Sequence, residues 1–226
     1  RRPAHRHGRR RRDPGAAGAK RRGSPAHLAV APLSDRHRHA HHAPSGADAL
    51  AHGAGCEIDL QQAATWLRKA AVNGDPKGQY EFGLLFIHPD YPKRNEEEAF
   101  RWIRLSAIAG FAPAQYQLAL FYQAGEGTIA SYEEAFTWAR RAAAQGEEKA
   151  LLLLASLYRF GAGTSANITA AYAIASYLSS AENPNATALL QTLEPQIAVS
   201  DRARVQKMLS STKSALELIE NIAALG

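Results

Sequence analysis

The stretch AFRWIRLSAIAG occupies residues 99–110, and two variants of it, AATWLRKAAVNG at 63–74 and AFTWARRAAAQG at 135–146, lie 36 residues to either side. All three begin with alanine, carry tryptophan at the fourth position and end with glycine. A motif that recurs at a fixed interval of about 20–50 residues is the signature of a repeat architecture. The sequence therefore predicts a chain built mainly from units of 36 residues.

Each unit is predicted to contain two helices joined by a short turn. The first helix opens with a residue whose side chain can cap a helix N-terminus, and these residues stand at one phase: Asp59, Asn95, Ser131 and Asn167. A glutamine or glutamate three residues later predicts a capping box, in which that side chain returns a hydrogen bond to the backbone of the cap residue: Gln62, Glu98 and Glu134. Apolar residues follow at helical spacing, up to a glycine that can adopt the left-handed conformation typical of a helix end.

The fold expected from this pattern is an all-α solenoid of about four 36-residue helix-turn-helix repeats with a C-terminal capping helix. The units start near residues 59, 95, 131 and 167 and fill 56–196. The capping helix falls within 197–226, where apolar residues recur at helical intervals. We expect the three tryptophans to differ, with Trp102 sandwiched between neighbouring units.

The units resemble the Sel-1-like repeat family, which is related to the tetratricopeptide repeats. The resemblance rests on the pattern of the first helices and on the second helices QYEFGLLF (79–86), QYQLALFY (115–122) and ALLLLASLY (150–158), and it covers about residues 59–196. The sequence departs from the family pattern at Pro89 and Tyr91, which replace the glycines of the turn between units, and in the fourth unit at Ile174 and Glu182. The resemblance implies that the first helices line a concave surface on which family members hold other proteins.

Charge divides the chain into two parts. Residues 1–55 hold 12 lysines and arginines against 3 aspartates, 8 of the 9 histidines and no aromatic residue, whereas residues 56–226 hold 15 lysines and arginines against 18 carboxylates and all 18 aromatic residues. A segment without aromatic residues cannot bury enough apolar surface to offset the entropy of ordering it. We therefore expect 1–55 to be a disordered, basic, arginine- and histidine-rich tail. Its composition also leaves open a misread upstream reading frame that is not native coding sequence.

No apolar run reaches the roughly 18 residues that a membrane-spanning helix needs, and no secretory signal is visible in the chain as given. The first residue is Arg1 and the single methionine is Met208, so we expect the N-terminus to be incomplete. Localisation stays open between the cytoplasm and a bacterial cell envelope. We expect the protein to be monomeric.

The residues favour binding over catalysis. A single cysteine, Cys56, excludes an intrachain disulfide framework and a cysteine-based zinc site, and His88 is the single histidine after residue 55. The segments GEGTIA (125–130) and GAGTSA (161–166) match the dinucleotide fingerprint, but that motif needs a preceding strand, and here each segment follows a predicted helix. We interpret them as turns, and the histidine-rich segment 36–42 as solvated. We predict no enzymatic activity, no cofactor and no metal site.

One face of the first helices carries the candidate binding residues. Positions three residues apart share a face of a helix, and in each unit such a pair ends in arginine: Thr65 and Arg68, Arg101 and Arg104, Thr137 and Arg140. A ladder of guanidinium groups suits a groove that takes an acidic peptide or a C-terminal carboxylate through bidentate hydrogen bonds. The alternative is that these arginines only complement the helix dipole and that Glu97 pairs with Arg101 within its own helix.

A second periodic row, Phe100, Phe136 and Tyr172, is interpreted as core packing. We expect the chain to be a non-enzymatic protein–protein interaction module, a bacterial scaffold, adaptor or regulator, that binds a protein or an acidic peptide on the concave face. The alternative is binding of nucleic acid or an anionic surface through the basic tail, 1–55, which would be sensitive to salt and blind to sequence. We expect no specific nucleic-acid partner.

Overall fold

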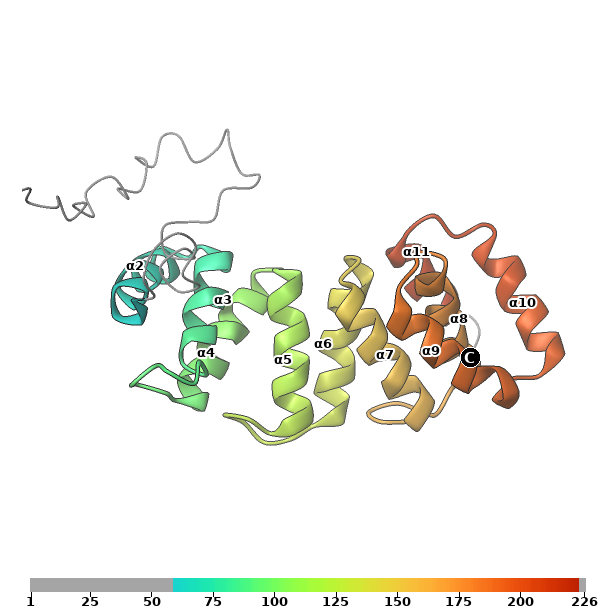
Figure 1. The fold of residues 1–226 in the computed structure, drawn as a ribbon, viewed down its shortest axis with the longest axis horizontal. Coiled ribbons are helices and arrows are strands. Elements are labelled where there is room, and N and C mark those ends of the chain that lie inside the picture. Colours follow the sequence, from blue (N-terminus) through green and yellow to red (C-terminus); the bar gives the residue numbers. More distant parts are fainter. Residues whose placement is uncertain (1–58, 224–226) are drawn as a thin grey trace, which may run out of the picture. The chain divides into compact units, whose positions relative to one another are not determined.

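The computed structural model describes residues 59–223, which lie within one compact unit of the chain, 47–226. The predicted tail, 1–55, lies outside the described residues. Within residues 59–223 every regular element is helical (Figure 1). The predicted all-α solenoid is confirmed. None of the described helices is both long enough and apolar enough to span a membrane.

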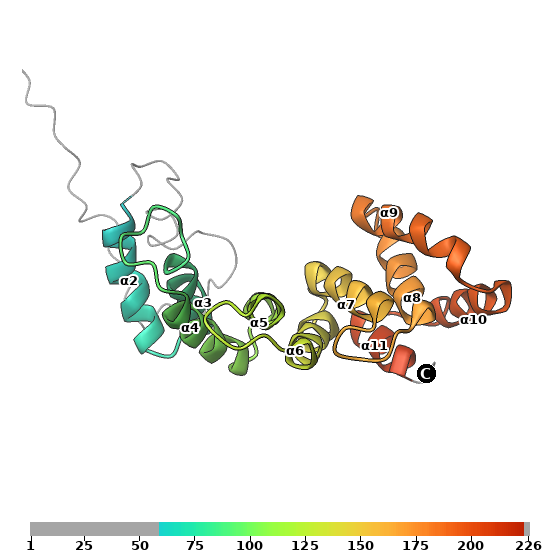
Figure 2. The same ribbon diagram turned by 90° about the horizontal axis from the view of Figure 1, so that it is seen from below.

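The helices follow one another in pairs. The first helix of a pair, which we call an A helix, is α2 (Leu60–Val72), α4 (Glu96–Ile108), α6 (Tyr132–Ala144) or α8 (Ile168–Ser179). The second, which we call a B helix, is α3 (Pro76–Leu85), α5 (Ala112–Ala124), α7 (Glu148–Phe160) or α9 (Pro184–Leu193). We number these pairs as units 1 to 4. A short 3-10 helix, Glu194–Gln196, leads to α10 (Val199–Leu209) and α11 (Ala215–Ala223). From α2 to α9, each helix packs against the next one (Figure 2).

Polar side chains start the A helices, as predicted. The cap side chains accept a hydrogen bond from the backbone N–H three residues later, at 2.9, 3.1, 3.2 and 2.8 Å: Asp59, Asn95, Ser131 and Asn167. Each bond satisfies one of the donors that a helix leaves free in its first turn.

The second half of the predicted capping box is wrong at Asn95 and Ser131. The backbone N–H of Asn95 donates to the carbonyl of Phe86 at 3.0 Å, and that of Ser131 donates to the carbonyl of Tyr122 at 2.9 Å. The turn between units brings the cap residue back to the end of the preceding B helix, where carbonyls lack partners within the helix. These carbonyls take the donor that the capping box would have used.

Residues in the left-handed conformation end the A helices. The glycines at this place have φ values of 80°, 92° and 88°: Gly74, Gly110 and Gly146. In unit 2 the N–H of Gly110 donates to Ala107 at 3.1 Å and that of Phe111 donates to Ser106 at 3.2 Å, which is the Schellman pattern. Unit 4 has Glu182 at this place, with a φ of 61°. This conformation costs a residue with a Cβ atom about 1–2 kcal/mol.

Small residues let the helices approach closely. The recurring alanines of the A helices have no exposed surface: Ala63, Ala99, Ala135 and Ala171. On the B helix of unit 1 the corresponding small residue is Gly83, which is buried. A Cβ atom added to Gly83 would lie 2.6 Å from Cγ1 of Ile103 on α4. The contact between units 1 and 2 therefore requires glycine at this position.

Aromatic pairs join the A and B helices of units 2 and 3. The ring centroids of Phe100 and Tyr122 lie 5.5 Å apart, and those of Phe136 and Tyr158 lie 5.2 Å apart. Both pairs meet edge to face, which is a favoured aromatic geometry. Tyr172, the next member of the row, is buried in unit 4. The row is core packing, as predicted.

The tryptophans differ in burial, as expected, but Trp138 is the most enclosed of the three. Trp66 is 37% exposed, Trp102 is half-buried and Trp138 is 8% exposed. Trp102 packs back on Phe82 of unit 1, with ring centroids 5.2 Å apart. The helix that carries Trp138, α6, packs against α11 as well as against its neighbours α5 and α7. Trp138 itself belongs to a core cluster that includes Ile103 of α4 and Leu118 of α5.

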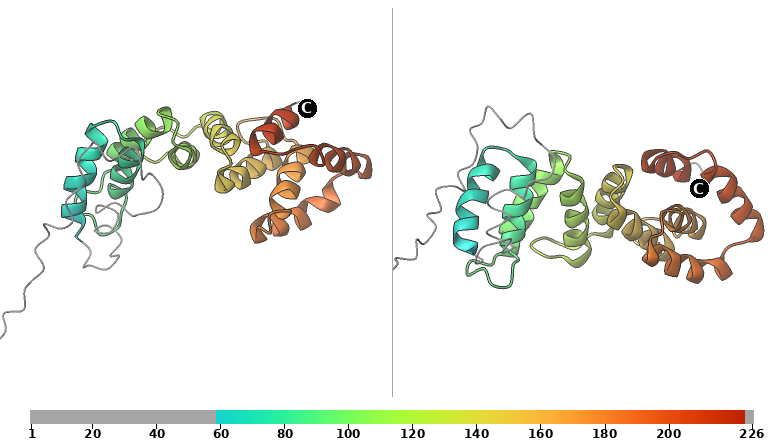
Figure 3. Two further views of the ribbon diagram at one scale, coloured as in Figure 1. Left: turned by 90° about the horizontal axis from the view of Figure 1, so that it is seen from above. Right: turned by 45° about the horizontal axis from the view of Figure 1, so that its top comes forward.

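The C-terminal helices fold back onto the A helices. α10 packs against α8, and α11 packs against both α6 and α8 (Figure 3). On α11, Leu218, Ile219 and Ile222 are buried. They belong to a core cluster that includes Ala142 of α6 and Ala173 of α8. Part of the A-helix row is therefore covered by the chain itself.

Glutamines connect the helix ends of units 2 and 3. The side-chain N–H of Gln115 on α5 donates to the carbonyl of Ala107 at 3.1 Å, near the end of α4. The side-chain oxygen of Gln115 accepts a hydrogen bond from Gln145 at 2.7 Å, at the end of α6. In unit 1, Gln79 donates in the same way to Ala71 at 3.3 Å.

One glutamine lacks its second bond, and this generates a prediction. The buried side-chain oxygen of Gln79 has no hydrogen-bond partner, because Ala109 stands where unit 3 has Gln145. We expect Ala109→Gln to supply the donor and to raise the free energy of unfolding by about 1 kcal/mol. Gln145→Ala should lower it by about 1–3 kcal/mol, because it leaves the oxygen of Gln115 buried and unpaired. Urea denaturation of the full chain measures both, and a loss of stability in Ala109→Gln would contradict the pairing.

The left-handed helix ends yield a second prediction. We expect Glu182→Gly to raise the free energy of unfolding by about 1 kcal/mol, because glycine adopts a positive φ without strain. Gly110→Ala should lower it by about 1 kcal/mol; the added Cβ atom would meet nothing within 4 Å, so only the backbone conformation is penalised. Thermal unfolding compares the two variants. A shift in the same direction for both would show that the helix-end conformation does not set their stability.

Candidate functional site

The six predicted binding residues all lie exposed on A helices. Each helix carries one pair: Thr65 and Arg68 on α2, Arg101 and Arg104 on α4, Thr137 and Arg140 on α6. The structure does not gather them into one cavity. Only Thr65 and Arg68 line a common hollow.

The ladder arginines differ from Arg101 in their partners. Arg101 forms an ion pair with Glu98 at 2.8 Å, so the pairing with Glu97 that belonged to the alternative interpretation is wrong. The spacing of three residues still places both groups on one face of α4. Within residues 59–223, the guanidinium groups of Arg68, Arg104 and Arg140 have no carboxylate partner.

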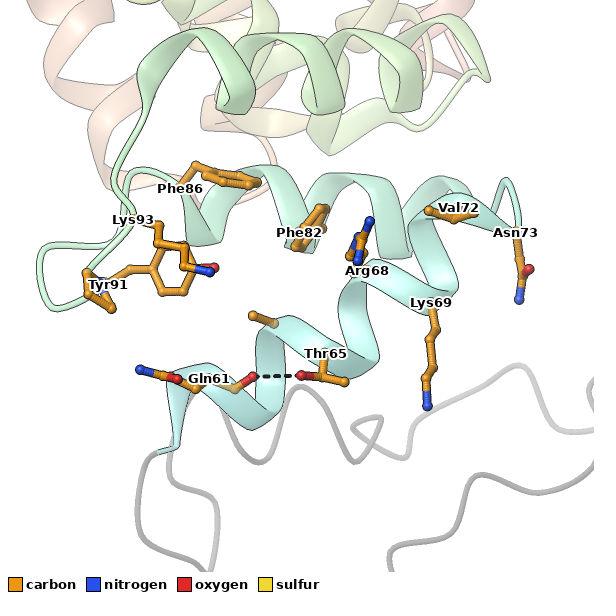
Figure 4. A pocket seen from close by; sticks show the side chains of 12 residues that line it. Gln61, Thr65, Arg68, Lys69, Val72, Asn73, Phe82, Phe86, Tyr91 and Lys93 are labelled. Carbon is orange, nitrogen blue, oxygen red and sulfur yellow. Dashed lines mark hydrogen bonds between the residues drawn. The ribbon is translucent and has the colours of Figure 1, made fainter.

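Unit 1 contains a hollow of about 780 Å³ between α2 and the segment 82–93. We call it the first-unit hollow. Its floor is aromatic and consists of Phe82, Phe86 and Tyr91. Figure 4 shows Arg68 beside Phe82 and Lys93 beside Tyr91. The sequence analysis did not predict this cavity.

The cations around the first-unit hollow are not balanced by acids. Arg68, Lys69 and Lys93 line it, and none of its lining residues is a carboxylate. Lys69 points away from the floor in Figure 4, and its ammonium group lies 4.3 Å from the ring centre of Trp66. The hydroxyl of Thr65 donates to the carbonyl of Gln61 at 3.0 Å. Thr65 therefore lines the hollow but does not offer this proton to a ligand. Arg68 and Lys93 therefore supply the charge that faces the hollow.

The first-unit hollow exists because one ring is missing. Position 64 is the unit 1 equivalent of Phe100 and Phe136, and it holds alanine. Phe86, the equivalent of Tyr122, consequently has no ring from α2 to pack against. Its ring contacts instead come from Phe82 at 5.1 Å and Tyr91 at 5.8 Å, measured between ring centroids. The break of the aromatic row at Ala64 was the sequence signal for this cavity.

The first turn between units departs from the family pattern, and Tyr91 in this turn has a structural role. This residue stands where later units have a glycine, and its side chain is buried against the ring of Phe86. Burial raises the pKa of the Tyr91 hydroxyl above its ordinary value. The hydroxyl therefore stays neutral at physiological pH and leaves the positive charge of Arg68 and Lys93 uncompensated.

The equivalent place in unit 3 is filled, but it keeps its arginine. Burial raises the pKa of Tyr158 above its ordinary value, and the positive charge of Arg140 lowers it by less. Arg140 thus lies within electrostatic range of the Tyr158 hydroxyl.

The two dinucleotide-like segments are turns. Gly127 and Gly163 have φ values of 64° and 71° and follow helices α5 and α7. A Cβ atom at Gly127 would collide with the carbonyl of Glu96, and one at Gly163 would collide with that of Tyr132. The glycines therefore serve the close contact between this turn and the start of the A helix. Among the described residues, no three His, Cys, Asp or Glu side chains gather as a metal site; the segment 36–42 lies outside that range.

A sequence profile of the Sel1 repeat matches residues 46–75, 76–111, 112–147 and 148–176. The chain belongs to the Sel1 repeat family. The predicted resemblance is confirmed, and the last three matches begin 36 residues apart, as the repeats in the sequence do. Sel1 repeat proteins generally mediate protein–protein interactions, and the family is generally a non-catalytic repeat scaffold.

Two solved structures are similar to this chain. A protective antigen present in uropathogenic Escherichia coli strains, with an SLR fold, has a TM-score of 0.70 and 24% identity and is matched over 81% of this chain and 40% of its own. A Sel1 repeat protein from Oxalobacter formigenes has a TM-score of 0.60 and 27% identity, over 73% of this chain and 67% of its own. This Sel1 repeat chain thus spans two fifths of the length of the first structure. No curated protein matches it.

The missing ring generates a stability prediction that needs no ligand. We expect Ala64→Phe to fill the first-unit hollow, pack against Phe86 and raise the free energy of unfolding by about 1 kcal/mol, in the range of an aromatic pair. Urea denaturation measures the effect. Ala188→Phe, at an exposed alanine of α9, is the matched control and should leave stability nearly unchanged. Destabilisation by Ala64→Phe would show that the hollow cannot accept a ring.

Proposed function

We propose that this Sel1 repeat chain is a protein–protein interaction module that holds its partner on the exposed face of the A helices. We identify this face with the concave surface that the family resemblance implies. It carries Arg68, Arg104 and Arg140, and we infer a scaffold, adaptor or regulator whose partner offers acidic groups. We expect a monomer to perform this function, because all of the proposed binding residues lie on the A helices of one chain.

The observation that carries the proposal lies in unit 4. The positions equivalent to Thr65 and Arg68 are Ala173 and Ser176 there. Their side chains are 0% and 9% exposed, whereas the equivalents in units 1 to 3 are exposed. Ala173 shares a core cluster with Val205 of α10 and Leu218 of α11. The chain therefore packs its own C-terminal helices over these positions in unit 4, whereas the equivalent positions of units 1 to 3 stay exposed.

The open part of this face combines apolar and cationic groups. Large apolar side chains are exposed beside the ladder arginines on α2 and α4: Val72, Leu105 and Ile108. Exposed apolar residues that gather beside polar ones mark interaction surfaces on soluble proteins, and arginine and aromatic residues are enriched at interfaces. The packing of α11 on the A helices α6 and α8 supports an amphipathic helix or segment as the partner.

The alternative function, binding of nucleic acid or an anionic surface, depends on the basic tail, 1–55. These residues lie outside the described part of the chain. Within residues 59–223, lysines and arginines number 15 against 17 carboxylates, so this part of the chain supports no general attraction for polyanions. The A-helix face is the better supported site.

The proposal predicts the effect of substitution at the central arginine. Arg104→Ala should weaken binding of a partner captured with the full chain by about 1.5–3 kcal/mol, the range for hydrogen bonds to charged groups. Arg104→Lys should also weaken it, because an ammonium group lacks the planar fork of arginine. Unfolding free energy should change little, because an exposed charge contributes about 0–1 kcal/mol. Titration of the purified partner against each variant measures the affinities.

The control for this titration is Lys149→Ala, which removes an exposed cation from the B helix α7. It changes net charge by the same amount as Arg104→Ala but leaves the A-helix face intact. Equal affinities for the wild type and Arg104→Ala, or an equal loss in the control, would contradict binding on the A-helix face.

A further inference from the structure

We infer that the first-unit hollow is a receptor for an acidic peptide segment that inserts one aromatic side chain. This inference rests on the proposed function, because it assigns a partner chemistry and a seat to the protein–protein interaction module. It goes further in naming a cavity in which one arginine of the ladder, Arg68, lies beside Phe82, Phe86, Tyr91 and Lys93.

The repeat itself shows what fits the first-unit hollow. In units 2 and 3 an aromatic side chain of the A helix packs edge to face on Tyr122 or Tyr158. Unit 1 retains the receiving ring, Phe86, but Ala64 supplies no ring. The volume of about 780 Å³ falls within the range of about 300–1,000 Å³ typical of ligand sites. A partner's phenylalanine, tyrosine or tryptophan would complete the pair that the chain leaves incomplete.

Charge complementarity sets the residues next to that ring. Arg68 has no carboxylate partner within residues 59–223, and no lining residue of the first-unit hollow is acidic. An aspartate or glutamate flanking the inserted ring would meet Arg68 in a bidentate arrangement and Lys93 as a point charge. The occupant is thus an aromatic residue with acidic neighbours.

A peptide fits the surroundings better than a nucleic acid does. Stacking rings and cations also suit bases and phosphates, but a nucleic-acid strand needs cations along its whole path. The A helices of units 2 and 3 begin with clusters of glutamates: Glu96, Glu97 and Glu98 on α4, and Glu133 and Glu134 on α6. A phosphate backbone that left the hollow along this row would meet these carboxylates. A short acidic segment needs only the local cations.

The test is selection of random peptides displayed on phage against the full chain. We expect enriched sequences to contain an aromatic residue flanked by aspartate or glutamate. Synthetic peptides of those sequences should lose binding to Ala64→Phe, in which the ring is already supplied, and keep it in the control Ala188→Phe. Arg68→Gln should weaken them about tenfold and Lys93→Gln about threefold. The last two variants change only exposed groups, so they keep the test valid should Ala64→Phe misfold.

Several results would overturn the inference. The selection could enrich no sequence, or it could enrich sequences that lack an aromatic or an acidic residue. The selected peptides could also bind Ala64→Phe and Arg68→Gln as tightly as they bind the wild-type chain. Peptides that ignore these two variants but lose binding to Arg104→Ala would overturn the hollow as receptor and leave the A-helix face as the binding surface. Oligothymidylate could compete with the peptides and lose its own binding in Ala64→Phe. That result would assign the hollow to nucleic acid instead.

Discussion

Close packing of helices at small residues is the constraint on which the rest of this structure depends. Four alanines, one in each A helix, have no exposed surface, and Gly83 admits α4 so closely that even a methyl group would collide with Ile103. Helices of about three turns cannot bury their apolar faces alone. Close approach to two neighbours lets each of them do so, and it also fixes which side chains meet. A 36-residue period follows, since every unit must present the same small residues to the next.

The binding sites that we propose lie where the units depart from this common frame. In both unit 1 and unit 4, a small residue replaces a larger one of the middle units. In unit 1 Ala64 replaces an aromatic residue and opens a cavity over Phe86. In unit 4 Ala173 and Ser176 replace a polar residue and an arginine, and the C-terminal helices settle there. The middle units keep both the ring pair and the arginine. The repeat thus supplies a constant scaffold. Its first unit carries an open cavity, and its fourth unit carries a surface that the C-terminal helices cover.

Local patterns in the sequence predicted much of this fold, and tertiary contacts account for what was missed. The caps at Asn95 and Ser131 and the glycine helix ends depend on a few adjacent residues, so periodicity sufficed to find them. The capping box failed because the competing carbonyl, at Phe86 for example, comes from another helix. The arginine face was predicted from helical spacing. The first-unit hollow was not, because its detection requires knowing that position 64 faces position 86 across the pair of helices. The seat of α11 on α6 and α8 depends on contacts across many residues of sequence.

The central claim is that the absent ring at residue 64 turns a packing position into a binding site. Its most direct test is nuclear magnetic resonance titration of the full chain with 3-phenylpropionate, which carries one ring and one carboxylate. We predict saturable shifts in the ring resonances of Phe82, Phe86 and Tyr91, with no such shifts from propionate or benzylamine. The shifts should disappear in Ala64→Phe. Absence of shifts in the wild-type chain, or equal shifts in Ala64→Phe, would contradict the claim.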